Sequence, residues 1–358
     1  MKNTSPATRY ASFMPQRDDL TLLSWCGPKG WLIPICILSA LALQLLALTL
    51  PFIEMSVFLE GQTIYGLLTT VKLLWKGELY TIAILIVSFS VVFPFVKLTG
   101  LMIAWVGLRP SPARSKLIKV LGTLGKWSMM DPFCVILLVA LSSGQWAVGA
   151  TTCVGVYCFL GAIVIAMVLS IIMSIADRRQ SPPNAPRDAP AFRVASKGGF
   201  EATLVPAALL VSLACIVLAF DVPLIQIDQF LLHSNAFGLA DVCIQLYKSN
   251  QHPLSALAWI GLGFVPLGVI ALEFWAWLAK STPNGHIARR HFIDYVHEWG
   301  MIDVFGLSLV LYLLEGSRFI KTEVRNGLWV LVGAVIMTQI SRRIAQHVVL
   351  RCVRQRSL

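Results

Sequence analysis

The sequence contains one short motif twice, as Trp127-Ser128-Met129-Met130-Asp131-Pro132-Phe133 and as Trp299-Gly300-Met301-Ile302-Asp303-Val304-Phe305. Both copies follow the pattern W-x-M-x-D-x-F, and they lie 172 residues apart. Apolar helices readily align Leu with Leu by chance, but they do not place Trp, Asp and Phe together in one register. The motif therefore predicts that the chain is an internal duplication, in which Trp127, Met129, Phe133 and their second-copy counterparts Trp299, Met301 and Phe305 are structural residues.

The same offset of 172 residues aligns the rest of the two halves without a gap. The aligned pairs include structurally demanding residue types: Pro34 with Pro206, Pro51 with Pro223, Pro94 with Pro266, Trp105 with Trp277, and Gly161 with Gly333. Proline has no backbone N–H and frees a carbonyl one turn earlier in a helix. We therefore expect a kinked helix at Pro94 and count Pro94 and Pro266 among the structural residues.

Composition excludes a soluble globular protein. Of the 358 residues 57% are hydrophobic and only 13% are charged, whereas ordinary soluble domains carry about 25% charged residues. Apolar runs of about 20 residues are long enough to cross the hydrocarbon layer as helices. We expect eight of them, near residues 31–50, 80–107, 130–149, 153–176, 203–222, 254–279, 301–316 and 327–346.

The expected fold is thus an all-α polytopic membrane protein with two tandem four-helix modules. Four spans, an even number, return each half to its starting side, so the modules are parallel repeats and not inverted ones. The expected boundaries are an N-terminal tail at 1–30, a first module at 31–176, a linker at 177–202, a second module at 203–346 and a C-terminal tail at 347–358.

Basic residues indicate the orientation. The two tails, the linker and the two loops on the same side contain 22 of the 29 Lys and Arg residues. Cytoplasmic segments of membrane proteins carry such an excess, so both termini are expected to be cytoplasmic. The same rule explains the net charge of +11 more simply than nucleic-acid binding does, and no nucleic-acid partner is expected.

Lys97 is the most unusual charge, because it lies within the second expected span, three residues after Pro94. A charge near the bilayer centre costs about 2.5–3.5 kcal/mol on insertion scales unless it is paired or hydrated. The side chain could instead extend to the interface, since a lysine stem can bridge about one helical turn. Lys97 is therefore a candidate functional residue with a simpler structural alternative.

Three acidic residues also lie within expected spans. Asp131 could cap a helix before Pro132, yet Asp303 recurs at the same repeat position without a proline. The second copy has Val269 in place of Lys97 and carries Glu273 one turn further along. Lys97, Asp131, Asp303 and Glu273 are thus the candidate lining of a polar cavity. A structural ion pair between Lys97 and Asp131 is an equally open alternative.

No recognised catalytic chemistry is evident. The eight cysteines contain no C-x-x-C pair, the six histidines show no metal-ligand spacing, and no nucleotide-binding or hydrolase motif occurs. We expect no enzyme activity, no cofactor and no metal. A thiol redox role for Cys153 and Cys158, five residues apart, is the weakest alternative.

These residues resemble the paraquat-inducible protein A family. The resemblance rests on W-x-M-x-D-x-F, on the preceding span with Pro94-x-x-Lys97 and on the amphipathic segments 66–79 and 238–250. It implies a multi-pass inner-membrane protein of Gram-negative bacteria that transfers membrane phospholipid to or from a periplasmic partner with mammalian-cell-entry (MCE) domains. It also implies that Lys97, Asp131 and Asp303 line polar pockets involved in coupling.

The chain departs from the family in one respect. Typical two-module members place zinc-ribbon C-x-x-C pairs before each module, whereas here only Cys26 precedes the first span and the linker has no cysteine. Bound zinc is therefore not expected. The alternative function is a membrane anchor or assembly protein for the periplasmic partner that does not itself transport lipid.

Overall fold

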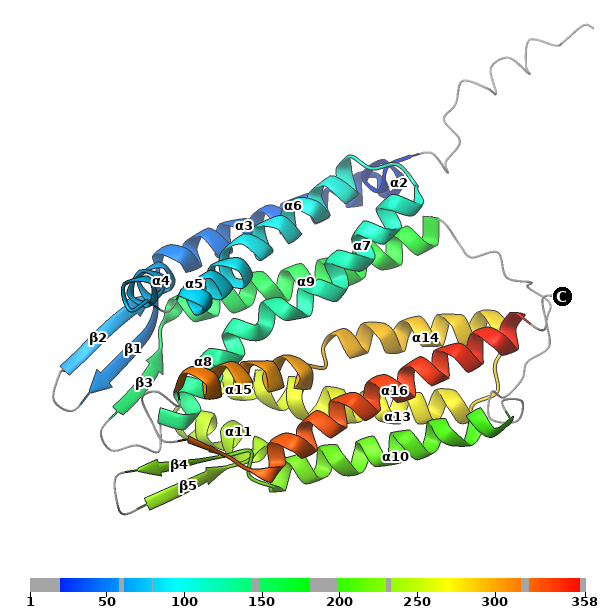
Figure 1. Cartoon of the computed structure of the whole chain (residues 1–358). Coiled ribbons are helices and arrows are strands. Elements are labelled where there is room, and N and C mark those ends of the chain that lie inside the picture. Colours follow the sequence, from blue (N-terminus) through cyan, green and yellow to red (C-terminus); the bar gives the residue numbers. More distant parts are fainter. Residues whose placement is uncertain are drawn as a thin grey trace, which may run out of the picture. The chain divides into compact units, whose positions relative to one another are not determined.

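The computed structural model describes residues 20–57, 61–78, 80–142, 148–180, 199–229, 233–316 and 322–354 (Figure 1). The chain divides into two compact units. Unit 1 comprises Met1–Leu50, Leu67–Ser128 and Tyr157–Pro183, and unit 2 comprises Pro51–Gly66, Met129–Val156 and Asn184–Leu358. Each unit is described by itself.

Unit 1 is helical throughout its described residues. Its helices pack around a core that includes Leu98, Leu101, Trp105 and Met173, and Trp105 Nε1 donates a hydrogen bond to the carbonyl of Gly30 at 3.0 Å. The elements in chain order are α2 (Leu22–Cys26), η2 (Gly27–Trp31), α3 (Leu32–Thr49), α4 (Leu67–Lys76), α5 (Tyr80–Ile86), η3 (Val87–Val92), α6 (Phe93–Val106), α7 (Pro112–Gly125), most of η4 (Lys126–Met129) and most of α9 (Val154–Gln180).

Unit 2 contains the second sequence module together with parts of the first. From the first module it takes β1 (Pro51–Val57), β2 (Gly61–Gly66), α8 (Met130–Ser142) and β3 (Val148–Thr152). The hydrogen bond between the side chains of Thr152 and Gln251 joins that sheet to the second module. The second module supplies α10 (Gly199–Asp221), β4 (Ile225–Gln229), β5 (His233–Phe237), α11 (Leu239–Lys248), α12 (His252–Ala258), η6 (Trp259–Phe264), α13 (Val265–Leu278), α14 (Pro283–Glu298), α15 (Ile302–Gly316), β6 (Thr322–Val324) and α16 (Asn326–Arg354).

The prediction of an all-α polytopic membrane protein is confirmed. Seven helical stretches in the described ranges are long and apolar enough to cross a membrane. Seven of the eight expected spans overlap one of these stretches each. The eighth, expected at 301–316, is the 15-residue helix α15.

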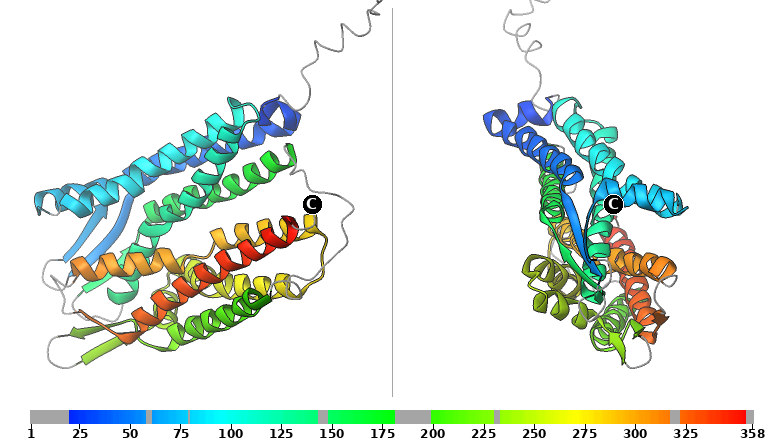
Figure 2. Two further views of the ribbon diagram at one scale, coloured as in Figure 1. Left: turned by 45° about the vertical axis from the view of Figure 1, so that its right-hand side comes forward. Right: turned by 90° about the vertical axis from the view of Figure 1, so that its left-hand side faces the viewer.

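Two small sheets add to the expected helices. Both are three-stranded and antiparallel, with strand orders β2-β1-β3 and β5-β4-β6. Their registers follow the duplication, since Ile53 pairs with Thr152 in the first sheet and Ile225 pairs with Val324 in the second. In unit 2, the strands β4 and β5 lie at one end of the long helices and α14 lies at the other (Figures 1 and 2). We call these the sheet end and the α14 end.

A π-helical segment precedes the expected proline kink in both modules. The segments are η3 and η6, which begin 172 residues apart and stand directly before α6 and α13. In each, the N–H that follows the segment bonds to the carbonyl five residues earlier, Phe93 to Ser88 and Val265 to Ile260. Such π turns are rare and frequently lie at functional sites. In the first module, η3 contains Ser90, and Pro94, two residues after η3, lines the first pocket described below.

Candidate functional site

Lys97 lies inside unit 1. Its side chain is buried, with 2% of its surface exposed, and it lines a pocket of about 230 Å³. Burial on this scale does not fit a lysine that extends to the membrane interface. The other lining residues are Gln44, Pro94, Leu98, Ser128, Ala162, Ile163 and Ala166.

Two uncharged polar residues, Gln44 and Ser128, line the pocket with Lys97, and a third, Ser90, is hydrogen-bonded to Gln44. The amide of Gln44 donates from Nε2 to the carbonyl of Ser90, within the π turn, at 2.9 Å. Gln44 Oε1, Ser90 Oγ and Ser128 Oγ are buried and have no hydrogen-bond partner among the residues that the structure describes. Buried polar atoms are nearly always hydrogen-bonded. Unsatisfied oxygens beside an ammonium group therefore indicate a place suited to a polar ligand.

Gly125, at the end of α7, makes room for the lysine. A Cβ atom at this position would collide with Lys97 Nζ. The ammonium group thus occupies the space where a side chain at residue 125 would begin. Any larger residue there requires Lys97 to move.

The second module has a pocket of about 440 Å³ at the equivalent position. Its lining residues are Ile216, Pro266, Val269, His297, Gly300, Ile302, Asp303, Ala334, Val335, Thr338 and Gln339. Seven of these eleven residues lie 172 positions after a residue that lines the first pocket. Those first-pocket residues are Gln44, Pro94, Lys97, Ser128, Ala162, Ile163 and Ala166. The duplication therefore produced two pockets, one in each unit.

The polar residues stand on different walls of the two pockets. Gln44, Lys97 and Ser128 of the first pocket are replaced by the apolar or small residues Ile216, Val269 and Gly300. The second pocket has polar groups elsewhere, at His297, Thr338 and Gln339, whose first-module counterparts are Gly125, Ala166 and Met167. The pocket is thus shared, but its chemistry is not.

The repeated motif forms a structural contact within unit 2. The rings of Phe133 and Phe305, which are repeat counterparts, meet edge to face with centroids 5.8 Å apart. Ser308 Oγ donates to the carbonyl of Met130 at 3.1 Å and links α15 to α8. Met129, Phe133, Met301 and Phe305 are all at most 1% exposed, while Trp127 and Trp299 are half-buried. The hydrophobic motif residues therefore pack α8 against α15.

The two motif aspartates have different surroundings. Asp131, in the first turn of α8, is 8% exposed and belongs to unit 2. Asp303 lines the second pocket, and its Oδ1 accepts a hydrogen bond from the N–H of Val304 at 3.0 Å. Lys97 belongs to unit 1, so the suggested pairing of Lys97 with Asp131 stays a prediction.

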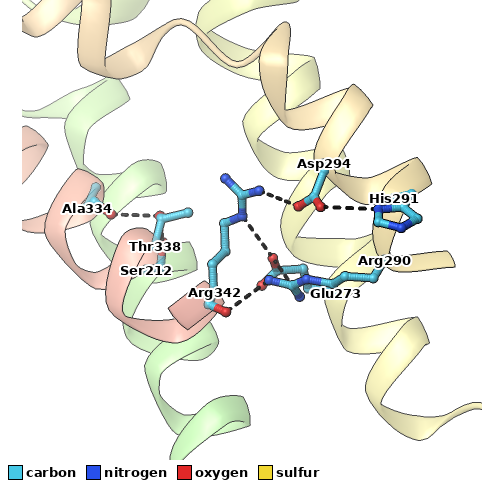
Figure 3. A network of polar contacts seen from close by, with 8 residues as sticks. All are labelled: Ser212, Glu273, Arg290, His291, Asp294, Ala334, Thr338 and Arg342. Carbon is cyan, nitrogen blue, oxygen red and sulfur yellow. Dashed lines mark hydrogen bonds and ion pairs between the residues drawn. The ribbon is translucent and has the colours of Figure 1, made fainter. Parts of the chain in front are cut away.

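Glu273 lies outside the pocket, one turn beyond Val269 on α13, in a cluster of charges (Figure 3). Its carboxylate is 3.6 Å from both Arg290 Nη1 and Arg342 Nε. Neither carboxylate oxygen accepts a hydrogen bond from any described residue. Arg342 Nη2 also donates to Asp294 Oδ1 at 2.6 Å, and Arg290 Nη2 donates to the carbonyl of Arg342 at 2.9 Å. This cluster ties α13 and α14 to α16.

The first module has a different charge pair near the same ends of its helices. Arg114 on α7 is fully buried, and its Nη2 lies 2.6 Å from Asp177 Oδ1 on α9. Arg114 also donates to Gln180 Oε1 at 2.9 Å, and Ser115 Oγ donates to Asp177 Oδ2 at 2.6 Å. This arginine lies on the loop helix, whereas in the second module the arginine that pairs with an aspartate, Arg342, lies on the last helix.

Sequence reasoning found four charged residues and missed most of their partners. Gln44 and Ser128 carried a usable signal, because one is an amide within an apolar run and the other lies inside the repeated motif. His297 and Thr338 are informative only when their counterparts Gly125 and Ala166 are set beside them. In the sequence, Arg290 and Arg342 count only among the basic residues that indicate orientation, and nothing marks them as partners of Glu273.

The cysteines give little support to redox chemistry. Cys153 and Cys158 are free thiols. Burial raises the pKa of the Cys153 thiol, and the nearby Glu54 carboxylate raises it further. A thiol with a raised pKa forms less of the reactive thiolate. Within the described ranges, no three His, Cys, Asp or Glu side chains are grouped so that they could hold a metal ion.

Comparison with known proteins gives one clear result. A family model described as paraquat-inducible protein A matches two segments, residues 33–179 and 203–349. Together they cover most of the chain and coincide with the two repeats. No curated protein and no solved structure matches the chain.

Proposed function

The chain belongs to the paraquat-inducible protein A family, and from that premise we propose that it is the inner-membrane subunit of an MCE-type lipid-transport system. It passes phospholipid between the bilayer and a periplasmic MCE-domain partner, and both of its termini are cytoplasmic. It acts as a transport subunit and catalyses no reaction.

The observation that carries the proposal is the buried ammonium group of Lys97 among unsatisfied oxygens. Lysine binds phosphate as a point charge, and Gln44, Ser90 and Ser128 supply further hydrogen-bonding groups. The pocket is small, so it can hold a polar group beside the ammonium group and not a whole phospholipid. Charge at Lys97 therefore controls transfer while the acyl chains stay in an apolar environment.

The test is substitution of Lys97 with a matched control in the other module. Lys97→Ala should reduce complementation of an envelope-lipid defect at least about tenfold, because it removes a charge that the pocket is built around. Val269→Ala, at the equivalent second-module position, should leave complementation near wild type. Immunoblotting of membranes must show equal abundance of both variants.

Gly125→Ala provides a second variant that keeps the lysine. Its Cβ would displace the ammonium group without changing any charge, so it should impair complementation in the same direction as Lys97→Ala. Normal complementation by both variants at normal abundance would sink the proposed mechanism.

The alternative function, an anchor for the periplasmic partner, predicts the opposite pattern. Substitutions of the buried charges would then be silent, and changes in the outer segments 52–79 or 224–253 would abolish co-purification of the partner. Co-purification of wild type and Lys97→Ala with the MCE-domain protein separates the two functions. The proposal expects the partner to remain bound while lipid transfer is lost.

A further inference from the structure

Each module contains an exposed pair of rings at the corner where its second expected span begins. In the first module, the rings of Trp75 on α4 and Tyr80 on α5 meet with centroids 5.0 Å apart. In the second, the rings of Tyr247 on α11 and His252 on α12 meet at 4.8 Å. Trp75 and Tyr247 lie 172 positions apart, as do Tyr80 and His252. The duplication therefore kept a ring pair while both of its residue types changed.

The backbone of this corner is also the same in both modules. Glu78 and Asn250 lie 172 positions apart, and both have a φ of 62°. Among the residues that the structure describes, they are the only two besides glycine with a positive φ. The N–H of Glu78 bonds to the carbonyl of Trp75 at 3.3 Å, and that of Asn250 bonds to the carbonyl of Tyr247 at 3.1 Å. Left-handed backbone is unfavourable for glutamate, so its retention indicates that the turn is required.

The rings do not belong to the core of either unit. Trp75, Tyr80 and Tyr247 are 54%, 48% and 64% exposed, and His252 is exposed as well. Rings that stay this exposed contribute little of the apolar burial that stabilises a fold. An arrangement that survived duplication at an exposed position therefore serves a contact outside the chain.

A lysine stands next to the ring pair in both modules. Lys76 directly follows Trp75, Lys248 directly follows Tyr247, and both lysines are exposed. Neither lysine forms an ion pair with any residue in the described ranges. Each corner thus combines amphipathic rings with a positive charge that the chain does not neutralise. Tryptophan, tyrosine and lysine are the residue types that anchor proteins at the boundary between lipid and water.

An exposed stripe continues from each ring pair along the helix that follows it. Exposed side chains recur every four residues, at 80, 84, 88, 92 and 96 in the first module and at 252, 256, 260 and 264 in the second. Residues four apart lie on one face of a helix, and apart from the rings and Ser88 these residues are apolar. Exposed apolar surface on a membrane span faces lipid chains. The ring pair therefore lies at the end of a lipid-facing stripe, at the level of the headgroups.

We propose that each corner is a phospholipid-binding site, in which the lysine holds the phosphate, the ring pair contacts the adjoining part of the lipid and the acyl chains follow the stripe. Lysine binds phosphate as a point charge. In unit 2, α11 lies at the sheet end, away from α14 (Figure 1), so the lipid belongs to the leaflet opposite the basic loops. It anchors the corner and is not the transported molecule, so the inference does not rest on lipid transport.

The experiment is photo-crosslinking of the whole chain in nanodiscs of phosphatidylethanolamine and phosphatidylglycerol, with a small share of a phospholipid that carries a diazirine beside its phosphate. Mass spectrometry of proteolytic peptides locates the label, which we expect within 72–84 and 244–256. Lys76→Ala should reduce the label at the first corner about fivefold, the effect of one lysine near an anionic membrane surface. It should leave the second corner unchanged. Lys248→Ala should do the reverse, so each corner is the control for the other.

Two substitutions of Glu78 test the turn without changing the lysine or the rings. Both remove the same carboxylate, but glycine adopts a positive φ readily whereas valine does not. Glu78→Gly should keep the label at the first corner, and Glu78→Val should lower it, because the turn no longer holds the two rings together. Size-exclusion chromatography must show that both variants are folded, as expected for substitutions at an exposed position.

Absence of label from both corners overturns the proposal. Label that persists at wild-type level in Lys76→Ala, Lys248→Ala and Glu78→Val overturns it as well, because the corners would then only be exposed to bulk lipid. Neither result depends on Lys97 or on a periplasmic partner, so failure here leaves the proposed function standing.

Discussion

The two pockets differ in which helix carries their basic side chain. In the first, Lys97 projects from α6 into the space left by Gly125 at the end of α7. In the second, α13 presents Val269 and α14 presents His297. The two modules thus carry their basic side chains on different helices, so a duplicated pocket can keep its position in the fold while its lining chemistry changes.

The ion pairs beyond the pockets also differ in which helix carries the basic residue. In the first module a buried arginine on the loop helix α7 pairs with an aspartate on the last helix α9. In the second module an aspartate on the loop helix α14 pairs with an arginine on the last helix α16, and Glu273 joins them. Both modules therefore tie the loop helix to the last helix with an ion pair, and the acidic and basic residues of that pair have exchanged helices. Three predictions test this comparison.

The largest expected effect is loss of the buried ion pair of the first module. Arg114→Ala leaves Asp177 buried without its partner, which should cost about 3–5 kcal/mol of unfolding free energy. Arg342→Ala should cost less, about 1.5–3 kcal/mol, because Asp294 is 31% exposed and can bind water, and the buried Glu273 keeps Arg290 as a charged partner. Reversible unfolding in mixed detergent micelles measures both losses.

Lys116→Ala, at an exposed position on α7, is the control and should change stability little. Equal losses for Arg114→Ala and Arg342→Ala would show that the two ties are energetically equivalent, contrary to their difference in burial.

An intermediate effect is expected where the two motif copies meet. Phe133→Leu and Phe305→Leu each remove one ring of an edge-to-face pair. A double-mutant cycle should give a coupling of about 0.5–1.5 kcal/mol, the range for aromatic pairs. Pairing Phe305→Leu with Phe159→Leu, a buried ring of unit 1, should give additive losses. Additivity in the Phe133–Phe305 cycle would contradict a direct coupling of the motif copies.

The smallest effect is expected at the beginnings of the loop helices. Ser111 Oγ accepts from the N–H of Arg114 at 3.2 Å, and Thr282 Oγ1 accepts from the N–H of Gly285 at 3.2 Å. Ser111→Ala and Thr282→Ala should each cost about 1 kcal/mol, the usual value of a lost N-cap. Faster hydrogen exchange in the first turns of α7 and α14 reports it.

Thr123→Ala, an exposed position within α7, should leave that exchange unchanged. If the cap variants exchange at wild-type rates, tertiary packing and not capping holds these helix beginnings.

The sheets show a limit of sequence reasoning. Residues 53–57 (Ile-Glu-Met-Ser-Val) and 225–228 (Ile-Gln-Ile-Asp) do alternate apolar and polar types, but over only four or five residues that directly follow long apolar runs. Their pairing is with distant segments, because β1 pairs with residues 148–152 and β4 with residues 322–324. The short alternation was a usable strand signal that the sequence analysis missed. The strand partners could not be predicted, because they lie about a hundred residues away along the chain.

The candidate residues show a second limit. Lys97 was recognisable because a charge within a hydrocarbon layer is costly wherever its helix faces. Gln44 and Ser128, which line the same pocket, come from two other segments, and a linear sequence does not reveal that these segments meet at the lysine. Glu273 was grouped with the pocket, but the structure places it one turn away, between Arg290 and Arg342.

The sequence by itself determined the membrane environment, the helical spans and the duplication. The lipid bilayer acts as a uniform solvent, and it requires long apolar helices whatever their packing. The 172-residue offset survives in residues that few substitutions can replace. Tertiary structure alone decided which wall of each pocket carries the basic group. That choice depends on a close approach between helices. The missing side chain of Gly125 admits Lys97 in the first module, whereas His297, at the position equivalent to Gly125, itself lines the pocket of the second module.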